Sequence, residues 1–192
     1  MDKNLNKRQI QAKNTYERIY NTAMNLVEKK GFENITVKEI CTKAGVSIGS
    51  FYNYFKSKQG ILDEIFRKAD QHFLNQVADD LEGDNAHDRI IKFFSHYASY
   101  CEAIKIDQLK QIYSTHNKFF IEKGRHMQNV LKDVIDEGKE SGELKTDIDS
   151  EEIVEYLFIA LRGVIFDWCL HDGSYNLVEF VANYTDRLLK TL

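Results

Sequence analysis

The segment Ser47–Lys58, with the sequence SIGSFYNYFKSK, concentrates side chains that suit contact with a phosphate backbone. Ser47 is a good helix N-cap, and the N–H groups of the first helical turn behind it favour an anion. Tyr54 and Lys58 are long side chains with polar tips, and Gly49 is small enough for another backbone to come close. These residue types suit a helix that lies in a DNA groove with phosphate contacts at both of its ends.

The helix expected over this segment has two different faces. At 100° per residue, Phe51 and Phe55 share one face with Tyr52 at its edge, and we expect these rings to pack inward. The opposite face carries Gly49, Ser50, Asn53 and Tyr54. The alternative to DNA binding is that this second face is simply the exposed surface of a small helical subdomain.

The residues before this segment predict the element that positions it. Thr36 and Glu39 have the spacing of a capping box, in which Thr36 accepts a backbone N–H and Glu39 reaches back to residue 36. A short helix therefore starts at Val37, and it stops before Gly45, which suits the left-handed position after a helix end. Two short helices joined by a tight turn that contains glycine form a helix-turn-helix.

The charge distribution supports a polyanion partner for the first part of the chain only. The 192 residues carry a net charge of −4, but residues 1–60 hold 11 basic and 5 acidic side chains, or +6, whereas residues 61–192 sum to −10. A basic N-terminal part on an acidic remainder indicates that only the former meets a polyanion. The alternative is a chance imbalance of solvated faces.

The stretch Tyr16–Leu62 resembles the N-terminal domain of TetR-family transcriptional regulators. The resemblance is carried by EKKGFENITVKEI, by AGVSIGSFYNYFKSK and by the apolar helix that follows, and it covers about 47 residues. In that family, the positions that commonly touch DNA correspond to Thr36, Lys38, Ser47, Ile48, Gly49, Ser50, Tyr52, Asn53, Tyr54 and Lys58. The resemblance implies that Thr36, Ser47, Tyr54 and Lys58 hold phosphates, and that Ile48, Gly49 and Asn53 face base edges.

Three positions depart from the usual pattern of the family. Ile48 stands where a polar residue is common, and it either contacts a thymine methyl group or packs beside Phe51. Asn53 replaces a frequent aromatic residue and can pair with adenine through two hydrogen bonds. Gly60 replaces a frequent glutamate in the first turn of the fourth helix. These departures bear on the operator sequence and not on the binding mode.

Helical periodicity continues through the chain, which contains no proline to interrupt it. The prediction is an all-α protein of about nine helices, with a helix-turn-helix domain over residues 1–60 and an effector-binding and dimerisation domain over residues 61–192. Residues 90–104 are apolar on nearly every side and are expected to form a central helix. Helices are expected over about 10–30, 37–44, 48–55, 61–77, 90–104, 107–114, 119–140, 150–170 and 177–188.

The last two helices carry more apolar residues than a lone surface needs. Gly163 lowers helix stability, and its usual benefit is the close approach of another helix. We expect a self-complementary two-fold contact between two helices of each protomer, and the resemblance implies the same four-helix dimer. The alternative is that both helices are buried within one protomer. The predicted interface residues are Ala160, Gly163, Val164, Leu177, Val181 and Tyr184.

Large and polar-tipped aromatic residues in the second domain suit a pocket for an apolar or flat molecule. The alternative for each ring is an ordinary place in the core. Arg162, in an apolar stretch, either binds an acidic ligand or pairs with Asp167 or an exposed glutamate. The candidate ligand-binding residues are Tyr97, Tyr100, Tyr113, Phe120, Phe158, Arg162 and Trp168.

The resemblance implies a homodimer that binds palindromic double-stranded operator DNA and responds to a small-molecule effector. We expect a repressor that an apolar or aromatic ligand releases from DNA. The alternatives are a ligand-activated activator, a regulator that depends on a co-repressor, and a helical protein-binding adaptor without DNA binding.

Other functional classes find no support in the residues. No histidine has a glutamate three residues before it, and neither a Walker loop nor a dinucleotide fingerprint occurs. We therefore expect no enzyme activity, metal or cofactor. The N-terminal residues show no signal peptide, and the longest apolar run, residues 156–161, is too short to cross a bilayer. Three isolated cysteines indicate reduced thiols, so a cytoplasmic protein without membrane contact is expected.

Overall fold

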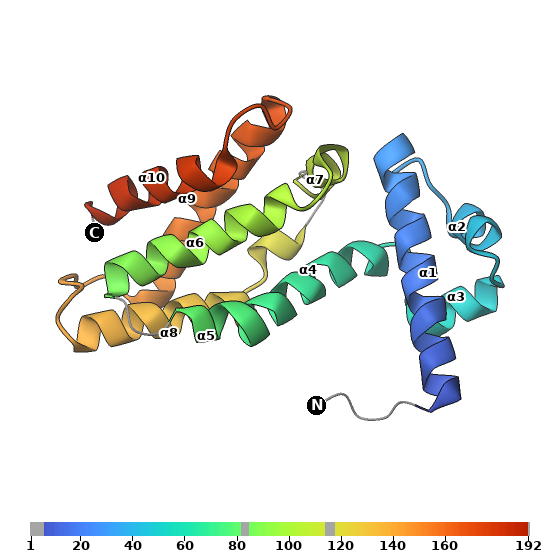
Figure 1. Ribbon diagram of the computed structural model, residues 1–192, viewed down its shortest axis with the longest axis horizontal. Coiled ribbons are helices and arrows are strands. Elements are labelled where there is room, and N and C mark those ends of the chain that lie inside the picture. Colours follow the sequence, from blue (N-terminus) through green and yellow to red (C-terminus); the bar gives the residue numbers. More distant parts are fainter. Residues whose placement is uncertain (1–5, 82–84, 114–117, 192) are drawn as a thin grey trace. The chain divides into compact units, whose positions relative to one another are not determined.

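The computed structural model describes residues 6–81, 85–113 and 118–191, and the regular elements of these residues are all helical (Figure 1). The all-α prediction is confirmed. The chain divides into two compact units, Met1–Ile65 and Phe66–Leu192. The sequence prediction placed the boundary after residue 60, where a helix begins that continues past the end of unit 1.

Unit 1 contains three complete helices: α1 (Lys7–Lys30), α2 (Val37–Ala44) and α3 (Ile48–Tyr54). Asn6 starts α1 with a capping box to Gln9. The core of the unit consists of fully buried apolar side chains from all three helices, including Ile19, Val27, Ile40 and Phe51. Because α2 and α3 are too short to be stable alone, this core is what holds them.

The turns of unit 1 follow the expected glycine pattern. Gly45 adopts the left-handed conformation, with φ 64° and ψ 42°, and connects α2 to the N-cap of α3. Thr36 caps α2 by accepting the N–H of Glu39 at 3.1 Å. The second half of the predicted capping box is wrong, because the Glu39 carboxylate lies 2.7 Å from the Lys30 ammonium. This contact lowers the pKa of Glu39 and ties the end of α1 to α2.

A continuous helical segment begins in unit 1 and continues in unit 2. It consists of α4 (Gly60–His72), a π-helical turn η1 (Phe73–Val77) and the single turn α5 (Ala78–Asp80). The sequence predicted one helix over about residues 61–77, and the structure confirms the continuous segment. It also contains a wider turn at Phe73–Val77 that the spacing of apolar residues did not indicate.

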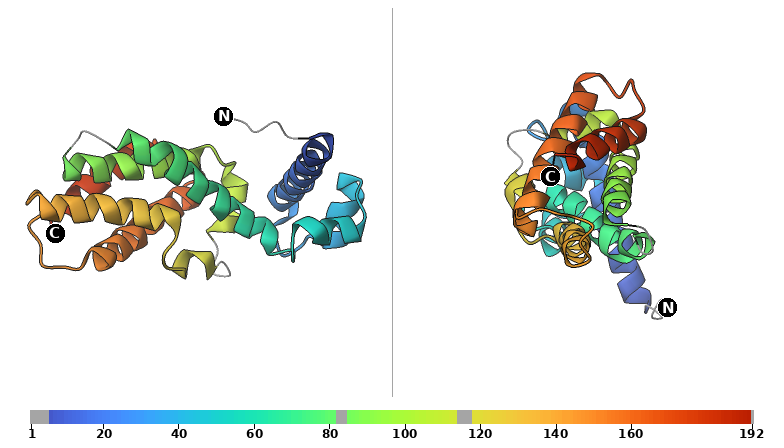
Figure 2. Two further views of the ribbon diagram at one scale, coloured as in Figure 1. Left: turned by 90° about the horizontal axis from the view of Figure 1, so that it is seen from below. Right: turned by 90° about the vertical axis from the view of Figure 1, so that its left-hand side faces the viewer.

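Unit 2 is assembled around α6 (Ala86–Glu102), as predicted for a helix that is apolar on nearly every side. In this unit α6 packs against α10 (Leu177–Leu189), α8 (His126–Glu140) and α9 (Ser150–Leu170). The right-hand view of Figure 2 shows α6 (light green) beside α10 (dark red). The short helix α7 (Ile106–Ile112) packs on α9.

The single long helix expected over about residues 119–140 is wrong. Residues Lys118–Ile121 form a separate 3-10 turn, η2, and α8 begins only at His126. Gly124, with φ 74°, interrupts the helix between them. Phe119 and Phe120 therefore belong to a connecting segment and not to the surface of a long helix.

A buried ion pair joins α4 to the start of α8 within unit 2. Two nitrogens of the Arg125 guanidinium each donate to one carboxylate oxygen of Asp70 at 3.1 Å, and both side chains are almost completely covered. The guanidinium also lies 5.2 Å from the centre of the Phe66 ring and 5.0 Å from that of Phe119. Phe66 and Phe119 stack on each other at 4.4 Å.

Breaking this ion pair is expected to lower stability more than breaking an exposed one. Arg125→Met leaves the Asp70 carboxylate buried without its cation, so we expect the free energy of unfolding to fall by about 3 kcal/mol or more. Lys190→Met removes the exposed partner of Asp186, 2.6 Å away, and is expected to change stability by about 0.5 kcal/mol or less. Urea unfolding at neutral pH measures the free energy of unfolding of both variants. Equal effects of the two substitutions would contradict a larger contribution from the buried Arg125–Asp70 pair.

Candidate DNA interface and ligand pocket

The helix α3 exposes one side and buries the other. Phe51 and Phe55 are buried, which confirms that these rings pack inward. Phe55 also stacks on Tyr16 of α1 at 4.9 Å, so the end of α3 is fixed against the longest helix of unit 1. The exposed side carries Ile48, Gly49, Tyr52 and Asn53.

The position of Ile48 excludes one of the two alternatives for its side chain. The side chain is 48% exposed, so it is not part of the core beside Phe51. Tyr52, expected at the edge of the inward face, is likewise half exposed, although its ring still meets Phe51 edge-on at 5.4 Å. Ile48 and Tyr52 stand one helical turn apart and form an exposed apolar ridge along α3.

Thr36, Lys38 and Ser47 lie at the starts of α2 and α3, and Tyr54 is the last residue of α3. Ser47 accepts the N–H of Ser50 at 3.0 Å, and its hydroxyl hydrogen is still available to an acceptor. Thr36 holds the equivalent cap of α2, and Lys38, the second residue of that helix, is exposed. Tyr54 is partly exposed, with its ring 6.1 Å from that of Tyr16.

Lys58 has a structural role in unit 1 that sequence reasoning missed. Its ammonium donates to the carbonyl oxygens of Phe32 at 3.0 Å and Ile35 at 3.3 Å, and it lies 4.6 Å from the centre of the Phe32 ring. The residue therefore fastens the loop that leads into the Thr36 cap. A phosphate contact by Lys58 would have to share its ammonium with these two carbonyls.

A cavity of about 520 Å³ opens in unit 2 and contains part of the predicted ligand site. Phe120, Phe158 and Arg162 line it, so the structure brings these three together from η2 and α9. Charged residues also line this cavity, where Lys123 pairs with Glu155 at 2.9 Å. The remaining lining residues are Ile121, Glu122, Gly124, Gln128, Asn129, Lys132, Glu151, Val154 and Ile159.

Arg162 connects two walls of this cavity through backbone carbonyls. Its guanidinium donates to the carbonyl of Phe158 at 3.0 Å and to that of Phe120. The expected pairing of Arg162 with Asp167 is wrong, because Asp167 accepts instead from the Tyr175 hydroxyl at 3.0 Å. Burial, together with this hydrogen bond, raises the pKa of Tyr175 to about 12.

Two of the predicted tyrosines stand next to the cavity residues. The hydroxyls of Tyr97 and Tyr113 are 2.5 Å apart and hydrogen-bonded to each other. Their rings contact Phe158 at 6.0 Å and Phe120 at 4.8 Å respectively. Burial raises the pKa of both tyrosines well above the usual value, so both hydroxyls are neutral at physiological pH.

Tyr100 and Trp168 lie away from this group. The ring of Tyr100 packs on His72 at 5.4 Å, on the side of α6 where His96 lies 2.7 Å from an oxygen of Asp80. Trp168 donates its ring N–H to the carbonyl of Tyr175 at 2.8 Å. Neither aromatic side chain lines the 520 Å³ cavity.

The predicted dimer residues divide between core and surface. Val164, Leu177 and Val181 are buried within unit 2, so they contribute little to the surface of the protomer. Gly163 is exposed, with open space where a side chain would stand, while Ala160 and Tyr184 are partly exposed. The exposed face instead presents large apolar side chains, which we call the α9–α10 stripe: Tyr156, Ile159, Phe166, Leu170 and Phe180.

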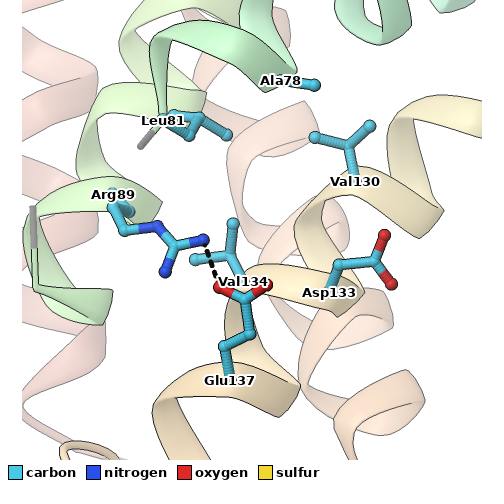
Figure 3. A pocket seen from close by; sticks show the side chains of 7 residues that line it. All are labelled: Ala78, Leu81, Arg89, Val130, Asp133, Val134 and Glu137. Carbon is cyan, nitrogen blue, oxygen red and sulfur yellow. Dashed lines mark hydrogen bonds and ion pairs between the residues drawn. The ribbon is translucent and has the colours of Figure 1, made fainter. Parts of the chain in front are cut away.

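A second hollow, of about 320 Å³, lies between α5, α6 and α8 (Figure 3). Figure 3 shows Arg89 reaching across it to Glu137, and the two charged groups are 2.7 Å apart. Among the described residues, Nε of Arg89 has no hydrogen-bond partner. None of the predicted ligand-binding residues lines this hollow.

Two further kinds of site have no counterpart in the described residues. Among them, no three histidine, cysteine, aspartate or glutamate side chains are grouped so that they could hold a metal ion. The same residues include no helix that is both long and apolar enough to span a membrane. All three cysteines are buried, and burial raises the pKa of Cys101 to about 12, so its thiol is not a nucleophile at neutral pH.

Comparison with solved structures shows a shared fold. A regulator called FadR from Bacillus subtilis, solved with stearoyl-CoA, superposes with a TM-score of 0.73 at 23% identity, over 91% of this chain and 97% of that one. FadR from Thermus thermophilus, described as a TetR-family repressor in complex with lauroyl-CoA, superposes with a TM-score of 0.62 at 19% identity, over 91% and 92% of the two chains.

Sequence comparison gives the family. The "Fatty acid metabolism regulator protein" of Bacillus subtilis (strain 168) is 27% identical over 181 residues, which cover 91% of this chain and 93% of that protein. Residues 19–65 match "Bacterial regulatory proteins, tetR family", and residues 66–191 match "YsiA-like protein, C-terminal region". Since these two matches span almost all of the described residues, the chain belongs to the TetR family and is a DNA-binding transcriptional regulator.

Proposed function

We propose that this regulator is a dimeric repressor that holds a palindromic operator through two copies of α3 and leaves it when a long-chain acyl-CoA binds in unit 2. The observation that carries the proposal is the exposed side of α3, where Ile48, Gly49, Tyr52 and Asn53 are presented by a helix whose other side is buried. A helix of this kind, at the second position of a helix-turn-helix, fits the major groove of DNA.

Charge and caps support the DNA contact. Residues 1–60 carry a net charge of +6, while residues 61–192 sum to −10, so attraction to DNA is confined to the first part of the chain. The hydroxyls of Thr36 and Ser47 stand at the starts of α2 and α3, and Lys38 is exposed beside the first of them. These groups are suited to phosphates, which fix the position of α3 but do not read sequence.

Dimerisation supplies the second copy of α3. The α9–α10 stripe exposes five large apolar side chains, and Gly163 lies among them without a side chain of its own. A set of exposed large apolar side chains at helical spacing is typical of an interaction site. Because the stripe runs along two neighbouring helices, a second copy related by a two-fold axis can cover it with the same residues.

The cavity in unit 2 is lined by apolar, basic and acidic side chains, of which the first two kinds suit an acyl-CoA. Its volume of about 520 Å³ lies within the usual range for ligand sites, and apolar side chains such as Ile121, Val154 and Phe158 suit an acyl chain. Lys123 and Lys132 belong to the same lining and carry the positive charge that phosphate groups favour. The two FadR structures with stearoyl-CoA and lauroyl-CoA share this fold and support the choice of ligand class.

The contacts around η2 offer a route from the cavity to α4. Phe120 lines the cavity and meets the Phe66 ring of α4 edge-on at 5.4 Å. Its neighbour Phe119 stacks on the same ring, and the Arg125–Asp70 pair ties the start of α8 to α4 one turn later. A ligand that moves Phe120 therefore acts on α4, whose first residues belong to unit 1. Release follows if the ligand favours an arrangement of α4 that does not suit the operator.

DNA binding is expected to be strongly salt-dependent, with Lys38 contributing one phosphate contact in each protomer. Lys38→Ala should reduce the slope of log affinity against log salt by about two for the dimer and weaken binding to all sequences alike. Fluorescence anisotropy with a palindrome selected from random DNA measures this slope. Lys145→Ala, an exposed lysine in unit 2, is the control and should leave the slope unchanged. Selected DNA without inverted symmetry, or an unchanged slope in Lys38→Ala, would contradict the proposed contact.

A charge placed in the α9–α10 stripe is expected to give monomers. Phe166 is 48% exposed, so Phe166→Glu should leave the protomer folded while a dimer would have to bury the new carboxylate. Sedimentation should show monomers at micromolar protein, and operator affinity should fall about a hundredfold or more because one α3 alone reads only half a site. Leu74→Glu, at 46% exposure outside the stripe, is the control and should stay dimeric. A dimeric Phe166→Glu would place the interface elsewhere.

Ligand and operator are expected to weaken each other by the same factor. Palmitoyl-CoA titrated calorimetrically into the free protein should bind more tightly than into the protein–operator complex, by the factor by which it lowers operator affinity. Equal affinity in both titrations would exclude palmitoyl-CoA as an inducer. Tighter binding in the presence of operator would make the protein a co-repressor-dependent regulator.

A variant of the cavity wall tests where that ligand binds. Ile121 is 73% exposed and lines the cavity, so Ile121→Asp should fold normally yet weaken palmitoyl-CoA about tenfold or more, because the acyl chain would strip water from the new carboxylate. Operator affinity without ligand should not change. Ile148→Asp, exposed outside the cavity, is the control. If Ile121→Asp bound palmitoyl-CoA as tightly as the wild-type protein does, the ligand would not bind in this cavity.

A further inference from the structure

We infer that Ile48 is a specificity-determining residue that selects thymine, through its 5-methyl group, at one position of each operator half-site. The inference rests on the proposed function, in which α3 enters the major groove. It adds what the residue recognises there and how the recognition is made.

The position of Ile48 indicates that its side chain contacts another molecule and not the rest of the protomer. Ile48 is the first residue of α3, directly after the Ser47 cap, and it is 48% exposed although it is large and apolar. It cannot donate or accept a hydrogen bond through its side chain, so it can neither hold a phosphate nor read the polar groups of a base. What it offers is apolar surface on a fixed helical scaffold.

The neighbours of Ile48 allow that surface to come close to a base edge. Gly49 follows it, and a side chain placed there would meet only the Ser47 hydroxyl, at 3.9 Å, so the helix surface is hollow beside Ile48. Tyr52 continues the apolar ridge one turn later, and Asn53 stands one turn after Gly49. The exposed side of α3 therefore carries two neighbouring rows of residues. One row is apolar and consists of Ile48 and Tyr52, and the other consists of Gly49, which has no side chain, and Asn53, which has an amide.

The chemistry of the major groove identifies the partner of the apolar row. Each unmodified base pair presents hydrogen-bonding groups there, and the thymine 5-methyl is the apolar group among them. Covering that methyl with Ile48 removes apolar surface from water on both partners, whereas a cytosine at the same position places its amino group against a side chain that cannot accept a hydrogen bond. Ile48 thus favours thymine by attraction and disfavours cytosine by an unpaired donor.

The test removes the methyl group and leaves the rest of the base pair intact. After the operator has been selected from random DNA with the wild-type protein, each thymine of the half-site is replaced singly by deoxyuridine, which keeps every hydrogen-bonding group. We expect one position at which this replacement weakens wild-type binding about fourfold per half-site, the factor for burying one methylene-sized group. Ile48→Ala should bind thymine and deoxyuridine equally at that position.

Ile10→Ala serves as the matched control, because Ile10 is an isoleucine of unit 1 with 47% exposure in α1. It should keep the wild-type ratio between thymine and deoxyuridine. A wild-type protein that binds a selected palindrome yet tolerates deoxyuridine at every thymine would overturn the inference while leaving the proposed function intact. The same holds if Ile48→Ala keeps the wild-type ratio. Failure to select any DNA would instead overturn the proposed function.

Discussion

The burial of Phe51 is the constraint on which the DNA-binding unit depends. A helix of seven residues is not stable alone, and α3 exists because this ring is fully covered while Phe55 stacks on Tyr16. The same contact decides which residues face outward, since fixing one side of a helix fixes the other at 100° per residue. Ile48, Gly49 and Asn53 reach solvent together for this reason, and the left-handed turn at Gly45 sets the point at which α3 begins.

Unit 2 shows a different use of aromatic residues, around a buried charge. The guanidinium of Arg125 lies near the rings of Phe66 and Phe119 and pairs with Asp70, so a charged group is satisfied inside a largely apolar region. The cluster depends on η2 being a separate segment, which Gly124 permits. Because Phe120 follows Phe119 directly, the wall of the cavity and the support of α4 are adjacent residues of one short turn.

Local signals in the sequence predicted local structure well. Thr36 and Gly45 gave the two boundaries of α2, and Ser47 gave the start of α3, because capping acts within four residues. Partners that are distant in sequence were not predictable in this way. Lys58 donates to carbonyls more than 20 residues earlier, and Arg162 reaches the carbonyl of Phe120 from α9. The sequence showed that α9 has more apolar residues than one buried face needs. The spacing of these residues fits two neighbouring faces of the helix equally well, so only the packing shows that Val164 faces inward and Phe166 outward.

Electrostatics places an additional condition on ligand control. Residues 61–192 sum to −10, so an anionic ligand of unit 2 approaches against the net charge and depends on local cations. Lys123 and Lys132 line the cavity but already pair with Glu155 and Asp136, at 2.9 Å and 2.6 Å. A ligand phosphate that pairs with either lysine therefore displaces a carboxylate into water. The favourable Coulomb energy of the new pair is largely offset by the loss of the ion pair that it replaces. Affinity must then come mainly from the apolar chain, and the charged part of the ligand contributes selectivity more than strength.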